Sequence, residues 1–340
     1  MVRVGRRSAT FYPPEGATAL IGDFTDWERN PIPLEGPLTL EFPEGAYVEY
    51  AFLDREGRPF PDPDNPEKAE NPWWSYPRAI KLPGFRYEAP PKPQEEPKVH
   101  RHRLGERRFY VAETGPSPKA TVVAQDGVAF YRTAGLHKVA RALFEAGEIP
   151  PVRLVFVEPI DRNTEYRFNE AYEAEFHRVL EEVEGAYGPL NELVLVGASL
   201  GGLFSLWQAW RHPERFPKVL ALSPALKAHP GGKDAYRDEE WLLARYAEAR
   251  RLPRVYVEVG LLEWLLGPNR RFAALLADKK APHAYQERPS GHNWVTWKQA
   301  LAPGLRYRWA PRWAESASWC FSPSRPSRPC SPGTTPWSWR

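Results

Sequence analysis

The feature that most constrains this 340-residue chain is a short segment in which an apolar strand runs into a glycine-flanked serine. Leu193–Val196 is apolar throughout, Gly197-Ala-Ser-Leu-Gly201 follows it, and a helical pattern begins near Leu203. A turn this tight needs small flanking residues, and it projects Ser199 above a parallel sheet at a helix N-terminus, where backbone N–H groups favour developing negative charge. The segment therefore predicts the nucleophile elbow of an α/β-hydrolase fold, with Ser199 as the nucleophile.

Four regions of different composition divide the chain. Residues 1–88 contain short alternating runs separated by Pro, Gly and Asp, which predicts a small all-β sandwich. The Pro-rich, charged residues 89–100 predict a semi-rigid linker. Apolar strands alternate with amphipathic helices over residues 101–310, a pattern typical of a mostly parallel sheet covered on both faces. Residues 311–340 are of low complexity and are expected to be a disordered tail, or the product of a shifted reading frame, and we assign them no function.

The periodicity also predicts individual elements. In the first region the expected strands are Ala17–Ile21, Leu38–Phe42, Tyr47–Phe52 and Arg78–Leu82. In the third region they are Arg108–Ala112, Ala120–Ala124, Val152–Val157, Leu193–Val196, Val219–Leu222 and Val255–Val259. The expected helices are Gly135–Ala146, Asn169–Tyr187, Leu203–Arg211, Glu239–Arg251 and Asn269–Lys279.

Composition narrows the classes of partner. A net charge of +3 without a basic run gives no support for nucleic acid or an anionic membrane as a partner. No apolar window is long enough for a membrane span or a secretory signal, so a cytoplasmic location is expected. Cys320 and Cys330 both lie in the tail, so we expect no thiolate metal site, and no metal or cofactor is predicted. Scarce Met, Asn and Gln beside abundant Glu, Arg and Pro predict a thermophilic source.

The general base is sought among the histidines that follow Ser199, because in this fold the chain order is Ser, acid, His. His292 lies in a glycine-containing loop directly before a helical stretch, which suits a base that turns toward the serine. We predict His292 as the base. The other histidines after Ser199 lie in less suitable positions: His212 near a helix end, His229 in a Gly/Pro-rich loop and His283 near the start of a strand.

The acid is expected where a strand between Ser199 and His292 ends. Glu263 follows the strand Val255–Gly260 and is the predicted acid. Glu258 is the rival, but it falls within the strand and is better placed for a structural role, and Asp278 falls in a solvent-facing helix pattern.

Two backbone N–H groups are the predicted oxyanion donors. One is the N–H of Leu200, the residue after the nucleophile. The other is the N–H of Val128, which follows the strand Ala120–Ala124 and an Asp-Gly turn.

Several segments together resemble the esterase family that contains the enterochelin (enterobactin) esterases, with antigen-85-type mycolyltransferases and feruloyl esterases as wider relatives. The segments are Gln125–Gly127, Pro159–Tyr166, Gly197–Gly202, Leu222–Pro224, Gly260–Glu263 and Gly291–Trp297. The resemblance implies the triad Ser199, Glu263 and His292 with backbone donors at Leu200 and Val128. It also places Arg162, Glu165 and Tyr166 near the active-site face, where they fix a loop or contact substrate.

The first region has a resemblance of its own. Ile21–Trp27 and Asp62–Pro66 are similar to the immunoglobulin-like early-set domain that precedes enterochelin esterase catalytic domains. Related modules bind glycogen or starch, so Trp27, Trp73 and Trp74 are an alternative sugar platform. We favour Trp27 in the core, with Trp73 and Trp74 packed against the catalytic domain or forming the edge of a lid.

These observations predict a serine esterase that hydrolyses a small-molecule carboxylic ester through an acyl-enzyme. The alternatives are an acyltransferase of the same family and a non-catalytic protein that binds carbohydrate through its first domain. A dedicated enterochelin hydrolase would line its pocket with cations, for which Arg162, Arg132 and Arg167 are candidates.

Overall fold

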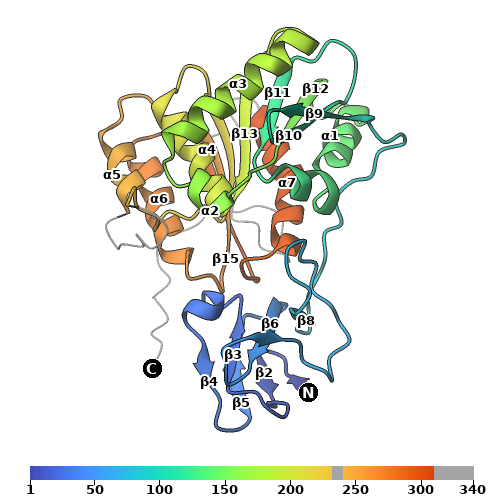
Figure 1. Cartoon of the computed structure of the whole chain (residues 1–340), viewed down its shortest axis with the longest axis vertical. Helices are drawn as coiled ribbons and strands as arrows, with labels where there is room; N and C mark the ends of the chain where they lie inside the picture. Colours follow the sequence, from blue (N-terminus) through green and yellow to red (C-terminus); the bar gives the residue numbers. More distant parts are fainter. Residues whose placement is uncertain (232–239, 310–340) are drawn as a thin grey trace.

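A sheet of eight strands organises the larger part of the chain (Figure 1). The structure is a computed structural model that describes residues 1–231 and 240–309, so the predicted tail and both cysteines lie outside the described residues. The strand order is β16-β15-β14-β13-β11-β12-β10-β9, parallel from β16 to β12 and antiparallel at β10 and β9. The strands are β9 (Val99–Leu104), β10 (Arg107–Glu113), β11 (Ala120–Ala124), β12 (Val152–Val157), β13 (Leu193–Ala198), β14 (Lys218–Leu222), β15 (Arg254–Gly260) and β16 (His283–Arg288).

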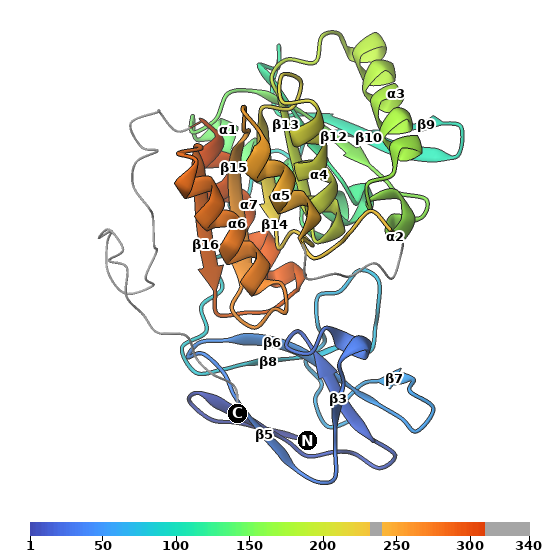
Figure 2. The ribbon, with the colours of Figure 1, turned by 90° about the vertical axis from the view of Figure 1, so that its left-hand side faces the viewer.

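Helices cover both faces of this sheet (Figure 2). Helices α3, α4, α5 and α6 pack on one face, and α1 and α7 pack on the other. The helices are α1 (Leu136–Glu145), α2 (Arg162–Glu165), α3 (Glu170–Tyr187), α4 (Leu200–Arg211), α5 (Trp241–Glu248), α6 (Leu266–Asp278) and α7 (Trp294–Trp309). Because both faces are covered, the central strands are buried and mainly apolar, with charged side chains such as Arg153 in β12 and Glu258 in β15 as exceptions, and the predicted α/β-hydrolase fold class is confirmed. No helix in the described ranges is long and apolar enough to cross a membrane.

Within the eight-stranded sheet, the two strands that the sequence did not predict are the edge strands. Strands β9 and β16 lie at the two edges and carry His, Arg, Gln and Glu among half-exposed residues, so neither shows an apolar run. Helix α4 begins at Leu200 rather than at Leu203, because Gly201 and Gly202 conceal the start of the helical pattern.

Residues 1–88 form two small antiparallel sheets around a separate core (Figure 1). One sheet has the order β1-β2-β5, and the other has β4-β3-β6-β7 with β8 also paired to β6. The strands are β1 (Val2–Val4), β2 (Ser8–Phe11), β3 (Ala19–Gly22), β4 (Ile32–Pro33), β5 (Leu38–Glu41), β6 (Tyr47–Leu53), β7 (Pro59–Phe60) and β8 (Arg78–Lys81). We call these residues the N-terminal β region. Its immunoglobulin-like character and the domain limits stay predictions.

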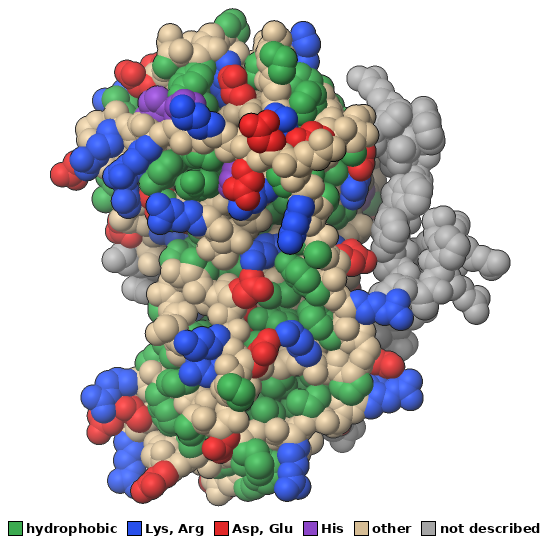
Figure 3. Space-filling model, turned by 90° about the vertical axis from the view of Figure 1, so that its right-hand side faces the viewer, with side chains coloured by type: hydrophobic (Ala, Val, Ile, Leu, Met, Phe, Trp, Pro, Cys, Tyr) green, Lys and Arg blue, Asp and Glu red, His purple; other side chains and the backbone are tan. Residues whose placement is uncertain are grey.

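The surface of both regions carries mixed charge. On the face drawn in Figure 3, Lys and Arg side chains are interspersed with Asp and Glu over both the upper and the lower part of the molecule. Neither sign of charge gathers into one broad patch on this face.

The N-terminal β region contacts the loops that follow β15 and β16. The Tyr47 N–H donates to the Pro289 carbonyl at 3.1 Å, and Asn293 Nδ2 donates to Asp23 Oδ2 at 2.9 Å. Two carboxyl groups, those of Asp23 and Glu49, are buried at this contact. Burial raises the pKa of Asp23 to about 7, and burial together with the Asp23 charge raises the pKa of Glu49.

The raised pKa of Asp23 makes the stability of the fold depend on pH. A carboxyl group whose pKa is higher in the folded state stabilises that state below its unfolded pKa, and the stabilisation is lost as the pH rises through the folded pKa. For Asp23 this window runs from about pH 4 to about pH 7, and the difference is on the order of 4 kcal/mol. We expect the melting temperature of the parent to fall between pH 5 and pH 8, and to fall less in Asp23→Asn. Thermal unfolding followed by circular dichroism measures this, and an identical pH dependence in both proteins would contradict it.

Candidate active site

Ser199 sits in a strained backbone conformation between β13 and α4. Its φ of 56° and ψ of −120° lie in a region that residues with a Cβ rarely adopt. Three main-chain hydrogen bonds hold it there: Ser199 N–H donates to the Leu222 carbonyl at 2.8 Å, and the Ser199 carbonyl accepts from Ala225 at 3.0 Å and from Leu203 at 3.0 Å. The strain is therefore fixed by the strand before Ser199, the helix after it and the neighbouring strand end.

Glycines make this turn sterically accessible. A Cβ on Gly197 would lie 2.2 Å from the carbonyl carbon and oxygen of Gly201, closer than any real contact. A Cβ on Gly202 would lie 3.2 Å from Pro224, and one on Gly201 would lie 3.1 Å from Asp126 Oδ2. The small residues that flank Ser199 in the sequence thus have a direct steric cause.

Glu263 and His292 form a hydrogen-bonded pair. His292 Nδ1 and Glu263 Oε2 are 2.7 Å apart, and Glu263 Oε1 accepts from Ser223 Oγ at 2.6 Å and from the Gly260 N–H at 2.7 Å. An ionised carboxylate only accepts hydrogen bonds, so the Nδ1 of His292 carries the proton and Nε2 keeps its lone pair. The pair therefore leaves Nε2 able to take a proton.

Two tryptophans fix the imidazole ring of His292. The Trp264 ring centroid lies 4.7 Å from it and the Trp297 ring centroid 4.9 Å from it, the latter nearly perpendicular. Trp297 Nε1 also donates to Ser223 Oγ at 3.0 Å, so the ring that holds His292 is coupled to the hydroxyl that holds Glu263.

Strand register brings Ser199, Glu263 and His292 to one edge of the sheet. Ala198 at the end of β13 pairs with Leu222 of β14, which pairs with Glu258 of β15. Gly260 at the end of β15 pairs with the last residue of β16. Each predicted residue follows the carboxyl end of one of these strands, which is where ligands bind in open parallel sheets. The rival acid, Glu258, is instead buried within β15 and bonded to Arg288 and to Tyr256 Oη.

The two predicted oxyanion donors differ in their surroundings. Leu200 is the first residue of α4, where a backbone N–H has no acceptor one turn earlier in the helix. The Val128 N–H, by contrast, donates to Glu158 Oε2 at 2.6 Å. Burial raises the pKa of that Glu158 carboxyl group. The Val128 N–H can therefore stabilise an oxyanion only after this carboxyl group moves. Its role as an oxyanion donor stays a prediction, and no sequence signal indicated its contact with Glu158.

Arg162 and Tyr166 hold the loop beside the elbow. Arg162 forms a two-pronged ion pair with Asp126 at 2.7 and 3.1 Å and also donates to the carbonyl of Ala198 at 3.1 Å. The Tyr166 side chain is fully buried, and its hydroxyl accepts from the Asp126 N–H at 2.7 Å. Tyr166 thus supports the loop from inside the protein and does not line an open surface, whereas Arg162 remains partly exposed. Glu165 pairs with the buried Arg107, a partner that sequence reasoning missed.

The three tryptophans of the alternative sugar platform are neighbours, with ring centroids 6.5 Å apart for Trp27 and Trp74 and 6.0 Å apart for Trp73 and Trp74, but they differ in exposure. Trp27 is 9% exposed and belongs to a core cluster of the N-terminal β region. Trp73 and Trp74 are 42% and 48% exposed. Trp73 also contacts Trp294 with ring centroids 5.6 Å apart and lies under the Arg162 guanidinium at 5.2 Å, so it borders the candidate site.

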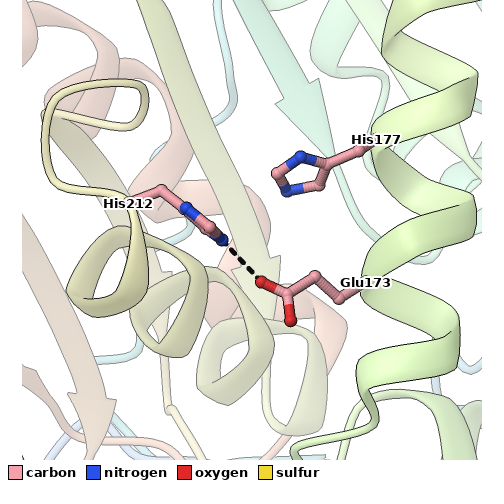
Figure 4. Close-up of side chains that lie close together, drawn as sticks. All are labelled: Glu173, His177 and His212. Atoms are coloured by element: carbon pink, nitrogen blue, oxygen red, sulfur yellow. Dashed lines mark hydrogen bonds and ion pairs between the residues drawn. The ribbon is translucent and has the colours of Figure 1, made fainter.

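One cluster in the described parts of the chain has the side chains of a metal site: Glu173, His177 and His212 (Figure 4). Arginines occupy it, since Arg211 Nε donates to Glu173 Oε1 at 3.1 Å and Arg215 Nη1 donates to His177 Nδ1 at 2.8 Å. The positive charges of these arginines disfavour binding of a metal cation. We therefore assign the cluster a structural role, in which it joins α3 to the end of α4. Helix α4 has 12 residues, which puts this end about 18 Å from Ser199.

The eight-stranded sheet, the elbow and the Glu–His pair define an α/β-hydrolase. Residues 108–307 match the family described as Putative esterase, and the chain belongs to this family. This confirms the resemblance that the sequence motifs indicated.

Known relatives agree with this assignment. The chain is 27% identical over 249 residues to the iron(III) enterobactin esterase of Escherichia coli K12, an alignment that covers 69% of this chain and 62% of that protein. The chain thus spans less than two thirds of the length of this curated relative. The crystal structure of the Shigella flexneri enterobactin esterase in the presence of enterobactin has a TM-score of 0.69 at 20% identity, over 90% of this chain and 94% of that one. A ferulic acid esterase has a TM-score of 0.54 at 20% identity, over 63% of this chain and 98% of that one. The two structures show the shared fold.

The elbow should tolerate no side chain at Gly197. We expect Gly197→Ala to lower the free energy of unfolding by at least about 3 kcal/mol, because the new methyl group overlaps the Gly201 main chain. The matched control is Gly185→Ala in the exposed last turns of α3, where a Cβ meets nothing within 4 Å and should stabilise by up to about 1 kcal/mol. Urea denaturation measures both, and equal stability of the two variants would show that the turn is less constrained than the geometry implies.

Proposed function

We propose that this protein is a serine esterase that hydrolyses a carboxylic ester of a small molecule through an acyl-enzyme. The single observation that carries the proposal is the bonded pair of Glu263 and His292 at the sheet edge where Ser199 is held in its strained turn. Membership of the Putative esterase family supports an ester as the bond that is cleaved.

In the proposed reaction, His292 Nε2 accepts the hydroxyl proton as Ser199 Oγ attacks the ester carbonyl carbon. The tetrahedral intermediate collapses, and the leaving alkoxide takes the proton back from His292 as the alcohol departs. His292 then takes a proton from water as the water oxygen attacks the acyl carbon, and it gives this proton to Ser199 Oγ as the carboxylic acid is released. Glu263 keeps the imidazole in the productive tautomer, and the Leu200 N–H contributes about 3 kcal/mol to oxyanion stabilisation.

The surroundings of the candidate arginines indicate the charge of the substrate. The relatives named above are esterases of enterobactin and of ferulic acid. A ferric siderophore is strongly anionic and calls for unpaired cations in the pocket. Of the three candidate arginines, Arg162 is paired with Asp126 and Arg167 is 9% exposed, whereas Arg132 lies exposed on the surface. This arrangement favours an ester of lower charge, and we propose such an ester as the substrate.

Hydrolysis of p-nitrophenyl acetate and butyrate tests the proposed function. We expect Ser199→Ala to lower kcat/KM by at least about 10³-fold, because the variant retains the oxyanion donor and the base but has no nucleophile. Product analysis with added alcohol separates hydrolysis from acyl transfer.

The matched control is Ser205→Ala in the same helix α4. The Ser205 hydroxyl is buried and donates to the Gly201 carbonyl at 2.8 Å. This variant should retain activity within about threefold. An Ser199→Ala protein that hydrolyses both esters at the parent rate would refute the proposed nucleophile.

A further inference from the structure

We infer that the N-terminal β region completes the active site, and that Asp23 is a positioning residue that holds the His292 loop through Asn293. This inference rests on the proposed function, because it concerns the residue that acts there as the base. It assigns the N-terminal β region a part in the hydrolase reaction and does not treat it as an independent sugar-binding module.

Asp23 joins the two regions through one oxygen atom. It follows strand β3, and its side chain is fully buried. Its Oδ2 accepts from the Glu49 N–H at 2.8 Å and from Asn293 Nδ2 at 2.9 Å. Glu49 lies within β6 of the N-terminal β region, whereas Asn293 directly follows His292. The carboxyl group is therefore fixed by the β sheet on one side and holds the base-bearing loop on the other.

Asn293 passes this constraint to the following helix. Its Oδ1 accepts from the Thr296 N–H at 2.9 Å in the first turn of α7. Asn293 thus caps α7 with one side-chain atom and binds Asp23 with the other. The direction in which the chain leaves His292 is set by both contacts.

The residues before His292 are held by the same strands. Pro289 accepts through its carbonyl from the Tyr47 N–H at 3.1 Å, and Ser290 Oγ donates to the Tyr47 carbonyl at 3.2 Å. At Gly291 the packing is so close that a Cβ would lie 2.0 Å from the Cβ of Asp23. The His292 side chain itself contacts the catalytic region, at Glu263 and the flanking tryptophans.

The loop that carries Glu263 rests on the N-terminal β region as well. Leu262 packs against the main core cluster of this region, and Trp264 packs against its second cluster while contacting the His292 ring. The Leu262 N–H also donates to the Ser290 carbonyl at 3.1 Å, which joins the acid loop to the base loop. Both partners of Ser199 therefore lie on loops that are seated on residues 1–88.

Asparagine is a conservative replacement for Asp23, because it can keep the hydrogen bonds that Asp23 accepts. Its Oδ1 has no hydrogen-bond partner among the described residues, so only the acceptor function of Oδ2 is used. The amide oxygen of asparagine can serve as the same acceptor. Alanine instead leaves the buried Glu49 N–H without its acceptor and removes one of the two hydrogen bonds of Asn293 Nδ2, which keeps its bond to Ser290 Oγ at 3.1 Å.

The test measures kcat and KM for p-nitrophenyl butyrate with full-length parent, Asp23→Ala and Asp23→Asn. We expect Asp23→Ala to lower kcat by about 10- to 100-fold with KM within about threefold, because a misplaced base slows the chemical step more than binding. Asp23→Asn should restore kcat to within about threefold of the parent.

The control is Asp62→Ala, which removes another buried carboxyl group of the N-terminal β region. Asp62 accepts from Tyr50 Oη at 2.7 Å and from the Asp64 N–H at 3.0 Å, so these partners belong to residues 1–88. We expect a lower melting temperature but a kcat within about threefold of the parent. The inference is overturned if Asp23→Ala keeps the parent kcat, or if Asp62→Ala loses as much kcat as Asp23→Ala.

Hydrogen–deuterium exchange distinguishes a failure of this inference from a failure of the proposed function. The backbone amides of residues 290–296 should exchange at least about tenfold faster in Asp23→Ala than in the parent or in Asp62→Ala. If the parent hydrolyses no ester, the proposed function fails, yet exchange still decides the structural claim. Unchanged exchange in Asp23→Ala would overturn the inference whatever the activity.

Discussion

The strained backbone of Ser199 is the constraint on which the arrangement of the site depends. A non-glycine residue at φ 56° raises the free energy of the folded state by roughly 1–3 kcal/mol, and it persists only where its surroundings fix it. Here the end of β13, the first turn of α4 and the carbonyl of Leu222 all fix it. The elbow in turn requires the parallel sheet, since the Leu222 carbonyl is in place only because β14 lies in register beside β13.

The carboxyl ends of the parallel strands also determine where Glu263 and His292 lie. Glu263 and His292 are supplied by loops that follow β15 and β16, the last two strands on one side of the sheet. Loops at such an edge have few neighbours from the sheet itself. In this protein the missing support comes from the N-terminal β region, whose strands β3 and β6 contact residues 289–293. The two regions are therefore best understood as one functional unit.

Much of this arrangement was predictable from local sequence signals. Buried parallel strands are mainly apolar, so β11, β12, β13, β14 and β15 were found close to their observed bounds. The elbow was found because its geometry demands glycines at fixed positions. The pairing of Glu263 with His292 followed from the fixed chain order of the triad and from the strand that ends before Glu263.

What could not be predicted depends on contacts between distant segments. Edge strands β9 and β16 lack an apolar pattern because solvent reaches one side of them. Glu158 ends up against the Val128 N–H although 30 residues separate them, and Asp23 meets Asn293 across 270 residues. No spacing rule connects such pairs, because the fold alone brings them together.

The proposed reaction requires that Ser199 is an activated nucleophile, and covalent labelling tests this most directly. The protein would be treated with a fluorophosphonate, whose phosphorus is attacked by an activated serine with loss of fluoride, and then analysed by intact mass and peptide mapping. We expect one adduct, on the peptide that contains Ser199, and much slower labelling of the His292→Ala variant. No adduct on the folded protein, or an adduct on a different serine, would contradict the proposed reaction.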